Sequence, residues 1–124
     1  MREHLKVCII GNGFHSKRIQ KILRFKKIKF FIFKPKSKKN YKSENLNFLD
    51  KFNVFFIISP NKTHYHYIES LHKKGYIFCE KPPTNNIAEL EKLKKIKSNK
   101  IYYNFNFRFS KIAEILKDKN KYKL

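Results

Sequence analysis

Short apolar runs alternate along this chain with segments whose apolar residues recur at helical spacing. Strands that alternate with helices are typical of a parallel sheet with crossover helices on its faces. The apolar runs predict strands over residues 5–10, 29–33, 54–58, 76–79 and 100–109. The intervening segments predict helices over residues 14–25, 44–52, 64–74, 87–97 and 111–119. We therefore expect an α/β fold, a Rossmann-like doubly wound and mostly parallel sheet in one three-layer domain.

The sequence also indicates where some of these elements begin and end, and which strand is central. The run at residues 54–58 has no polar interruption, which predicts a central strand covered on both faces. Thr63 is a candidate cap for the helix that follows it, and Gly75 a candidate stop at the end of that helix. Either Asn85 or Asn86 caps the next helix, whose apolar stripe is predicted to be Ile87, Leu90, Leu93 and Ile96.

Length and composition set limits on the class of protein. A chain of 124 residues suits one domain, predicted over residues 1–119, with residues 120–124 as a frayed tail. No apolar run approaches the roughly 20 residues of a membrane span, and charged residues interrupt the N-terminus where a signal peptide would lie. Cys8 and Cys79 lie in apolar strands without metal-site spacing. They suit the core of a cytoplasmic protein, and no metal is expected.

The net charge of +21 has two explanations. One is a binding site for nucleic acid or another polyanion, supported by aromatic residues that alternate with polar ones from Tyr103 to Phe109. The other is an AT-rich coding sequence, because Lys, Asn, Ile, Phe and Tyr are all abundant and the lysines are spread along the chain. We favour the second explanation, with the alternating aromatic residues as a core face, so nucleic acid is not the expected partner.

A glycine turn joins the first strand to the first helix. Gly11 and Gly13 allow a tight turn and close approach of a pyrophosphate to backbone N–H groups, and Asn12, Phe14 and His15 complete the turn. The helix that follows presents its positive N-terminal end to that phosphate. The third small position of such a fingerprint is Ser16, a departure that weakens the motif without removing it.

The end of the second strand carries Lys34, where a carboxylate would accept the ribose hydroxyls of NAD. Further cations and a hydroxyl follow at Lys36, Ser37, Lys38 and Lys39. This pattern favours the 2′-phosphate of NADP, with NAD as the alternative because lysine is also the common surface residue of this chain.

Three later motifs follow in a characteristic order: Ser59-Pro60-Asn61 with His64, then Glu80-Lys81-Pro82 at the end of a strand, and then Asn106 to Phe109. With the glycine turn, they resemble the N-terminal NAD(P)-binding half of the glucose–fructose oxidoreductase, inositol dehydrogenase and rhizopine-catabolism (Gfo/Idh/MocA) oxidoreductase family. The resemblance covers nearly the whole chain. One departure is the short interval between Lys34 and Val54, which indicates a trimmed segment between the second and third strands.

The resemblance implies roles for individual residues. Lys81 would be the catalytic residue that orients the substrate or transfers a proton, Glu80 would position the cofactor, and Pro82 would follow a cis peptide bond. His64 either contributes to the cofactor site or packs the start of its helix, whereas His66 and His72 are expected on the surface. The predicted cofactor-binding residues are Gly11, Asn12, Gly13, Phe14, His15, Lys34, Ser59, Pro60, Asn61, His64, Glu80, Lys81, Pro82 and Arg108.

The same resemblance implies an activity and a missing part. Family members act on sugars, polyols or sugar nucleotides and carry a second α/β domain that forms the substrate site. We expect that domain to be absent here, so the chain would bind NADP or NAD but be inactive alone. A separate subunit that supplies the substrate domain is a candidate partner.

Overall fold

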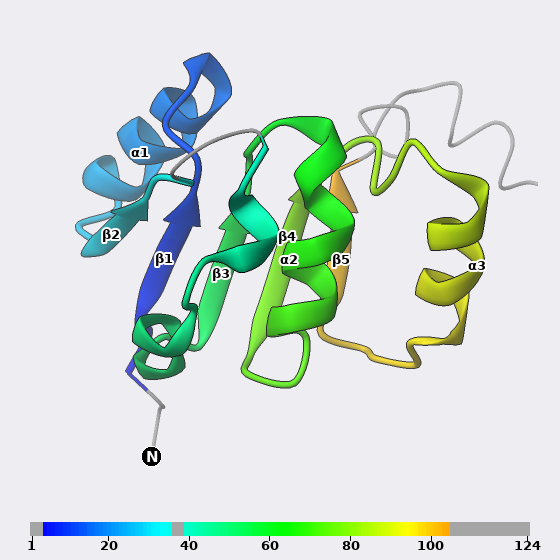
Figure 1. Ribbon diagram of the computed structural model, residues 1–124. Helices are drawn as coiled ribbons and strands as arrows, with labels where there is room; N and C mark the ends of the chain where they lie inside the picture. Colours follow the sequence, from blue (N-terminus) through cyan, green and yellow to red (C-terminus); the bar gives the residue numbers. More distant parts are fainter. Residues whose placement is uncertain (1–3, 36–38, 105–124) are drawn as a thin grey trace, which may run out of the picture.

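All five strands of the computed structural model belong to one parallel sheet (Figure 1). The structure describes residues 4–35 and 39–104. The strands are β1 (Val7–Ile10), β2 (Phe30–Phe33), β3 (Val54–Ile57), β4 (Tyr76–Glu80) and β5 (Ile101–Asn104), and their order in the sheet is β2-β1-β3-β4-β5. The chain therefore winds outward from β1 in one direction and then from β3 in the other, which confirms the predicted doubly wound fold.

The central strand is β3, as its unbroken apolar run predicts. Val54, Phe55 and Ile57 are buried, because β1 and β4 flank the strand and side chains cover its faces. Ile10 is in register with Phe33 on one side and with Ile57 on the other. Parallel strands in register bring their carboxyl ends to one edge of the sheet, at the top of Figure 1. The loops that carry the predicted motifs follow these ends.

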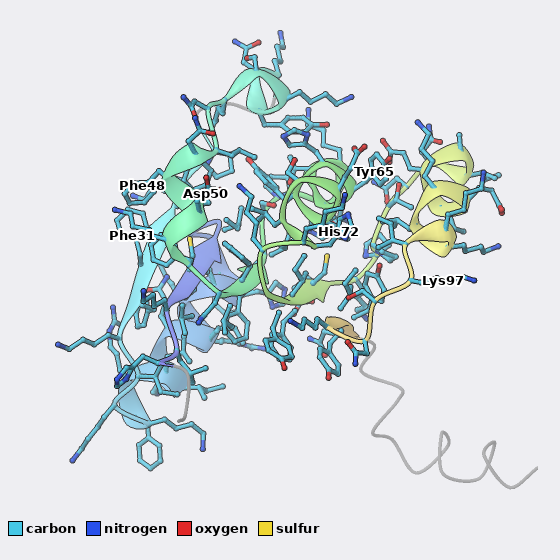
Figure 2. The ribbon with its side chains drawn as sticks, turned by 90° about the horizontal axis from the view of Figure 1, so that it is seen from below. Phe31, Phe48, Asp50, Tyr65, His72 and Lys97 are labelled. Carbon is cyan, nitrogen blue, oxygen red and sulfur yellow. The ribbon has the colours of Figure 1, made fainter. Side chains whose placement is uncertain are left out.

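Helices pack on both faces of the sheet. The helix α1 (Phe14–Phe25) packs through Leu23 against a cluster that contains Val7 and Ile9. The helix α2 (His64–Leu71) packs through Ile68 against the opposite face, and Figure 2 shows α1 and α2 on opposite sides. A third helix, α3 (Ile87–Lys95), contributes Leu93 to the same cluster as α2. No helix in the described part of the chain is long and apolar enough to cross a membrane.

The predicted helix over residues 44–52 is wrong. The crossover from β2 to β3 instead contains two short 3-10 helices, η1 (Tyr41–Ser43) and η2 (Asn47–Lys51). The side chain of Asn45 accepts a hydrogen bond from the backbone N–H of Asn47, and such a local bond competes with α-helix formation. Aromatic packing then holds the segment, since Phe48 lies against Phe31, as labelled in Figure 2.

The helix that follows Thr63 is shorter than predicted, and its boundary residues act differently. Thr63 occupies the N-cap position of α2, but its hydroxyl donates to the Pro60 carbonyl at 2.7 Å and caps no backbone N–H. Gly75 lies beyond the helix end at Leu71. A Cβ at Gly75 would lie 2.1 Å from the Asn53 carbonyl oxygen. The glycine is therefore required for the close approach of the chain to the start of β3.

The helix α3 confirms one of the two predicted caps and only part of its stripe. Asn86 accepts a hydrogen bond from the N–H of Glu89 at 3.2 Å. Leu93 is buried, but Ile87 is 81% exposed and Leu90 38% exposed. The predicted apolar stripe is therefore wrong at its N-terminal end, because α3 lies near the β5 edge of the sheet and reaches the core only with its later turns (Figure 1).

The predicted fifth strand is described as far as Asn104. Tyr103 packs against the core, as the core-face interpretation of this strand predicts. Tyr102 points to the opposite face and stacks on Phe78, with ring centroids 5.2 Å apart. The rest of this strand, the helix over residues 111–119 and the tail at 120–124 lie outside the described residues.

Candidate functional site

The glycine turn after β1 brings three strand ends together. The N–H of Gly11 donates to the carbonyl of Phe33 at the end of β2, at 2.8 Å. Gly11 has φ of +111°, and a Cβ there would lie 2.8 Å from the Ile58 carbonyl oxygen just beyond β3. Glycine is needed here on both counts, because other residues avoid this φ and would collide with the backbone of β3.

Ser16 replaces the third small residue of the fingerprint and takes on a structural role. It is fully buried, and its hydroxyl donates to the Gly11 carbonyl at 2.8 Å. The Gln20 amide lies 3.0 Å from the Ser16 hydroxyl and 2.9 Å from the Asn12 side-chain oxygen. Gln20 therefore braces the turn from within α1. Gln20 was not among the predicted site residues. The signal for it in the sequence is a polar side chain one helical turn after Ser16.

Gly13 leaves the space above the turn open. The residue is exposed, and a Cβ there would meet nothing within 4 Å. Gly13 is also the N-cap of α1, with no side chain bonded to the N–H groups of the first turn. Unbonded N–H groups at a helix N-terminus attract anions such as a pyrophosphate.

A hollow of about 500 Å³ lies beside this turn, between the loops that follow β1, β2 and β3. Its lining consists of Gly11, Asn12, Gly13, Lys34, Pro35, Ile58, Ser59, Pro60 and Thr63. Six of the predicted cofactor-binding residues therefore meet in one place. Lys34 is exposed there, and no carboxylate belongs to the described lining.

A second hollow of about 490 Å³ lies on the other side of the β3 loop. Its lining consists of His15, Arg18, Ile19, Ile22, Ile58, Ser59, Asn61, Glu80, Lys81 and Asn104. The two hollows share Ile58 and Ser59, so they adjoin at the carboxyl ends of β1 and β3. This is the topological switch point, where open α/β sheets bind their ligands.

The segment after β4 carries the predicted catalytic residue. Lys81 is exposed at the second hollow, and the Lys81–Pro82 peptide bond is cis, as expected. The Glu80 carboxylate accepts a hydrogen bond from the Asn104 side-chain amide at 2.7 Å. Asn104 was missed by the sequence analysis, because only the pairing of β4 with β5 brings it beside Glu80.

His64 lies behind these loops and lines neither hollow. Its ring is fully buried, with Nδ1 2.7 Å from the Pro82 carbonyl and Nε2 2.7 Å from the Ser59 carbonyl. The expectation that His66 is a surface residue is wrong. His66 is partly buried against the rings of Tyr41 and Tyr67, and this burial lowers the pKa of its imidazole.

The remaining candidates add little chemistry to the site. Burial raises the pKa of the Cys8 thiol to about 12 and that of the Cys79 thiol further, so both stay protonated in the core. Among the described residues, no group of three or more His, Cys, Asp or Glu side chains is arranged to hold a metal ion. Phe14 is exposed on the first turn of α1, with the Arg18 guanidinium 5.0 Å from its ring centroid. Arg108 lies outside the described residues.

A doubly wound parallel sheet, a glycine turn at a helix N-terminus and a site across the switch point define a dinucleotide-binding domain of the Rossmann type. The family model of GFO_IDH_MocA, an oxidoreductase family with an NAD-binding Rossmann fold, matches residues 5–105. The chain belongs to this family, as the resemblance predicts. Its cofactor is accordingly a nicotinamide dinucleotide.

Solved structures show the same fold in larger proteins. A dehydrogenase (MviM) from Clostridium difficile is 21% identical with a TM-score of 0.65, over 94% of this chain and 44% of that one. The protein YPO2259 of Yersinia pestis is 17% identical with a TM-score of 0.63, over 98% of this chain and 40% of that one. The present chain thus spans less than half the length of these proteins. A comparison with curated protein sequences gives no match.

Proposed function

We propose that this chain is the cofactor-binding half of an NAD(P)-dependent oxidoreductase that acts on sugars, polyols or sugar nucleotides. The observation that carries the proposal is the pair of hollows that meet at Ser59. One hollow has the open glycine turn, and the other has Lys81. A dinucleotide has two nucleotide halves joined by a pyrophosphate, and two adjoining hollows suit that shape.

The proposed pose follows from the chemistry of the lining. The pyrophosphate lies over Gly13, where the N–H groups at the start of α1 are free of side-chain caps. The adenosine half extends towards Lys34 in the first hollow. The nicotinamide half enters the second hollow towards Asn61 and Glu80.

The first hollow supports a preference for NADP over NAD. A cation at the end of β2 attracts a 2′-phosphate, whereas a carboxylate there would accept the ribose hydroxyls of NAD. Lys34 supplies the cation, and the described lining contains no carboxylate that would repel the phosphate.

Lys81 is proposed as the residue that meets the substrate. When bound, the cofactor supplies the acceptor or donor of a hydride. Lys81 would hydrogen-bond the reacting hydroxyl or carbonyl oxygen and transfer a proton at that atom. Its side chain is exposed, so water competes for the same contacts. We therefore propose that a separate subunit or domain covers this hollow and completes the substrate site.

Cofactor titration of a Gly13→Val variant tests the proposed site. A Cβ at Gly13 would meet no protein atom within 4 Å, so a branched side chain would enter the open space above the turn. The variant should therefore fold, while the Kd for NADPH rises at least about tenfold. Ala88→Val also creates a valine, on an exposed turn of α3, and should leave the Kd unchanged. Normal binding by folded Gly13→Val would exclude the proposed phosphate position.

The choice of cofactor is tested by fluorescence titration with NADPH and NADH. The wild-type chain should bind NADPH more tightly, and Lys34→Glu should reverse that order by repelling the 2′-phosphate. Lys97→Glu makes the same charge change beyond α3 and should keep the wild-type order. If Lys34→Glu lowered the affinities for NADPH and NADH equally, the proposed preference for NADP would be contradicted.

A further inference from the structure

The buried ring of His64 connects two loops of the proposed cofactor site. Nδ1 lies 2.7 Å from the carbonyl oxygen of Pro82, and Nε2 lies 2.7 Å from the carbonyl oxygen of Ser59. Both partners are backbone carbonyls, which accept hydrogen bonds and donate none. Each ring nitrogen therefore needs its own proton to make its bond.

A neutral imidazole does not meet this requirement. It has one N–H, so it donates to one carbonyl and turns a lone pair towards the other oxygen. The imidazolium form has two N–H groups and donates to both. Distances of 2.7 Å lie within the range of N–H···O hydrogen bonds, so both nitrogens are close enough to donate. Turning the ring over would point carbon atoms at both oxygens and lose both bonds.

The two carbonyls belong to different segments, the loop after β3 and the segment after β4 that carries Lys81. Ser59 lines both hollows, and its hydroxyl shares a 2.6 Å hydrogen bond with Thr63 at the start of α2. Pro82 directly follows Lys81. A ring that bonds both carbonyls sets the position of the Lys81 segment relative to the loop in the middle of the site.

The charges of the surrounding elements are compatible with a cation at this position. The titratable groups on η3, α2 and β4, with the residue after β4, are Lys62, Tyr65, His66, Tyr67, Glu69, Tyr76, Cys79, Glu80 and Lys81. Burial raises the pKa values of Cys79 and Tyr67, which keeps both side chains neutral. Lys62 and Lys81 are exposed to solvent, which screens their charge. Glu69 and Glu80 are the two carboxylates in this described set, and Glu69 is exposed.

We propose that His64 is a positioning residue that acts as an imidazolium clamp between the Ser59 loop and the Lys81 segment. Loss of either ring proton frees one carbonyl and loosens the second hollow. The effect on cofactor binding rests on the proposed function, whereas the two protons on the ring are measured without any cofactor.

The protonation state is tested by long-range ¹H–¹⁵N NMR of the labelled full chain at pH 7. We expect both His64 nitrogens to show the shifts of protonated imidazole nitrogens, assigned by their absence from the spectrum of His64→Gln. The exposed His15 gives the comparison within the same sample. If His64→Gln does not fold, the four variants His4→Gln, His15→Gln, His66→Gln and His72→Gln assign the other rings. A single-proton tautomer at His64 would overturn the proposal.

The consequence for the site is tested by NADH titration at pH 7. NADH is used because it lacks the 2′-phosphate that Lys34 is proposed to bind. His64→Gln should raise the Kd about tenfold, because the ring that bonds both carbonyls is lost. His72→Gln, at the other end of α2, should behave as wild type.

The two proposals fail in different ways. A folded His64→Gln protein with the wild-type Kd overturns the clamp. A chain that binds no dinucleotide at any pH, while both His64 nitrogens carry protons, overturns the proposed function and supports the clamp.

Discussion

The two glycines of the first turn have different physical tasks. Gly11 supports the fold, because its φ of +111° and its contact with Ile58 exclude a side chain. Gly13 has an ordinary φ of −81° and open space at the position of a Cβ. The sequence pattern treats the two as one motif. Only the position of β3 relative to the turn shows the difference. It makes Gly11 necessary for the fold and leaves the space at Gly13 open for a ligand.

This difference predicts opposite outcomes for two alanine variants. Gly11→Ala should lower the free energy of unfolding by about 3 kcal/mol, since it adds left-handed strain and a backbone collision. Gly13→Ala should change the same free energy by less than about 0.5 kcal/mol. Urea denaturation followed by circular dichroism measures both. Equal destabilisation by the two variants would contradict the assignment.

At the scale of the element, the helices differ in how far their own sequence determines them. The helix α1 has its predicted bounds, because its apolar stripe and the preceding glycine turn agree. The segment with η1 and η2 was wrongly predicted as one helix, since a local Asn45 bond and aromatic contacts with Phe31 decide its form. For α3, the sequence predicted either Asn85 or Asn86 as the N-cap, and Asn86 is the N-cap in the structure.

The cap of α3 provides a test. Asn86→Ala removes the acceptor for the Glu89 N–H and should lower the free energy of unfolding by about 1 kcal/mol. The exposed neighbour Asn85 is the matched control, and Asn85→Ala should stay within about 0.5 kcal/mol of wild type. Thermal and urea denaturation measure both variants. A larger effect at Asn85 would mean that the helix starts one residue earlier.

At the scale of the whole molecule, the site is an open edge of a strongly basic domain. The net charge is +21, and the described residues include two ion pairs, Lys74 with Asp50 and Lys94 with Glu91. Most cations in the described part of the chain therefore face solvent. Charge of this size attracts polyanions without providing a shaped site for them.

Salt dependence separates the two kinds of binding. The Kd for NADPH should rise only modestly between about 50 and 200 mM salt, because few phosphates are contacted. Binding of a single-stranded oligonucleotide should weaken by several orders of magnitude over the same range if it uses many lysines. Isothermal titration calorimetry at several salt concentrations measures both. Oligonucleotide binding that persists at high salt would favour the polyanion function.

Turnover tests the open second hollow. Lys81 is exposed, so we expect the 124-residue chain to bind cofactor without appreciable reduction of NADP or NAD in the presence of sugars, polyols or sugar nucleotides. Absorbance at the wavelength of the reduced cofactor measures the rate, with Lys81→Ala as the control. Turnover that disappears in Lys81→Ala would show that this chain assembles a complete site by itself.

The sequence by itself determined the fold class, the strands, the glycine turn and the family. These depend on local patterns, namely apolar periodicity and short motifs in a set order, which remain visible in the unfolded chain. The trimmed crossover was likewise visible as a short interval before Val54. Predictions from such patterns fail where packing overrides them, as at the exposed Ile87 of α3.

The tertiary structure alone decided which distant groups meet. Gly75 is needed because the chain passes close to Asn53, and Glu80 has a partner because β5 pairs with β4. His64 bonds two carbonyls because α2 begins between the loops that follow β3 and β4. No local pattern specifies such contacts, since each depends on a distance between segments that are separate in the chain. The polar connections of the site arise only when the sheet assembles.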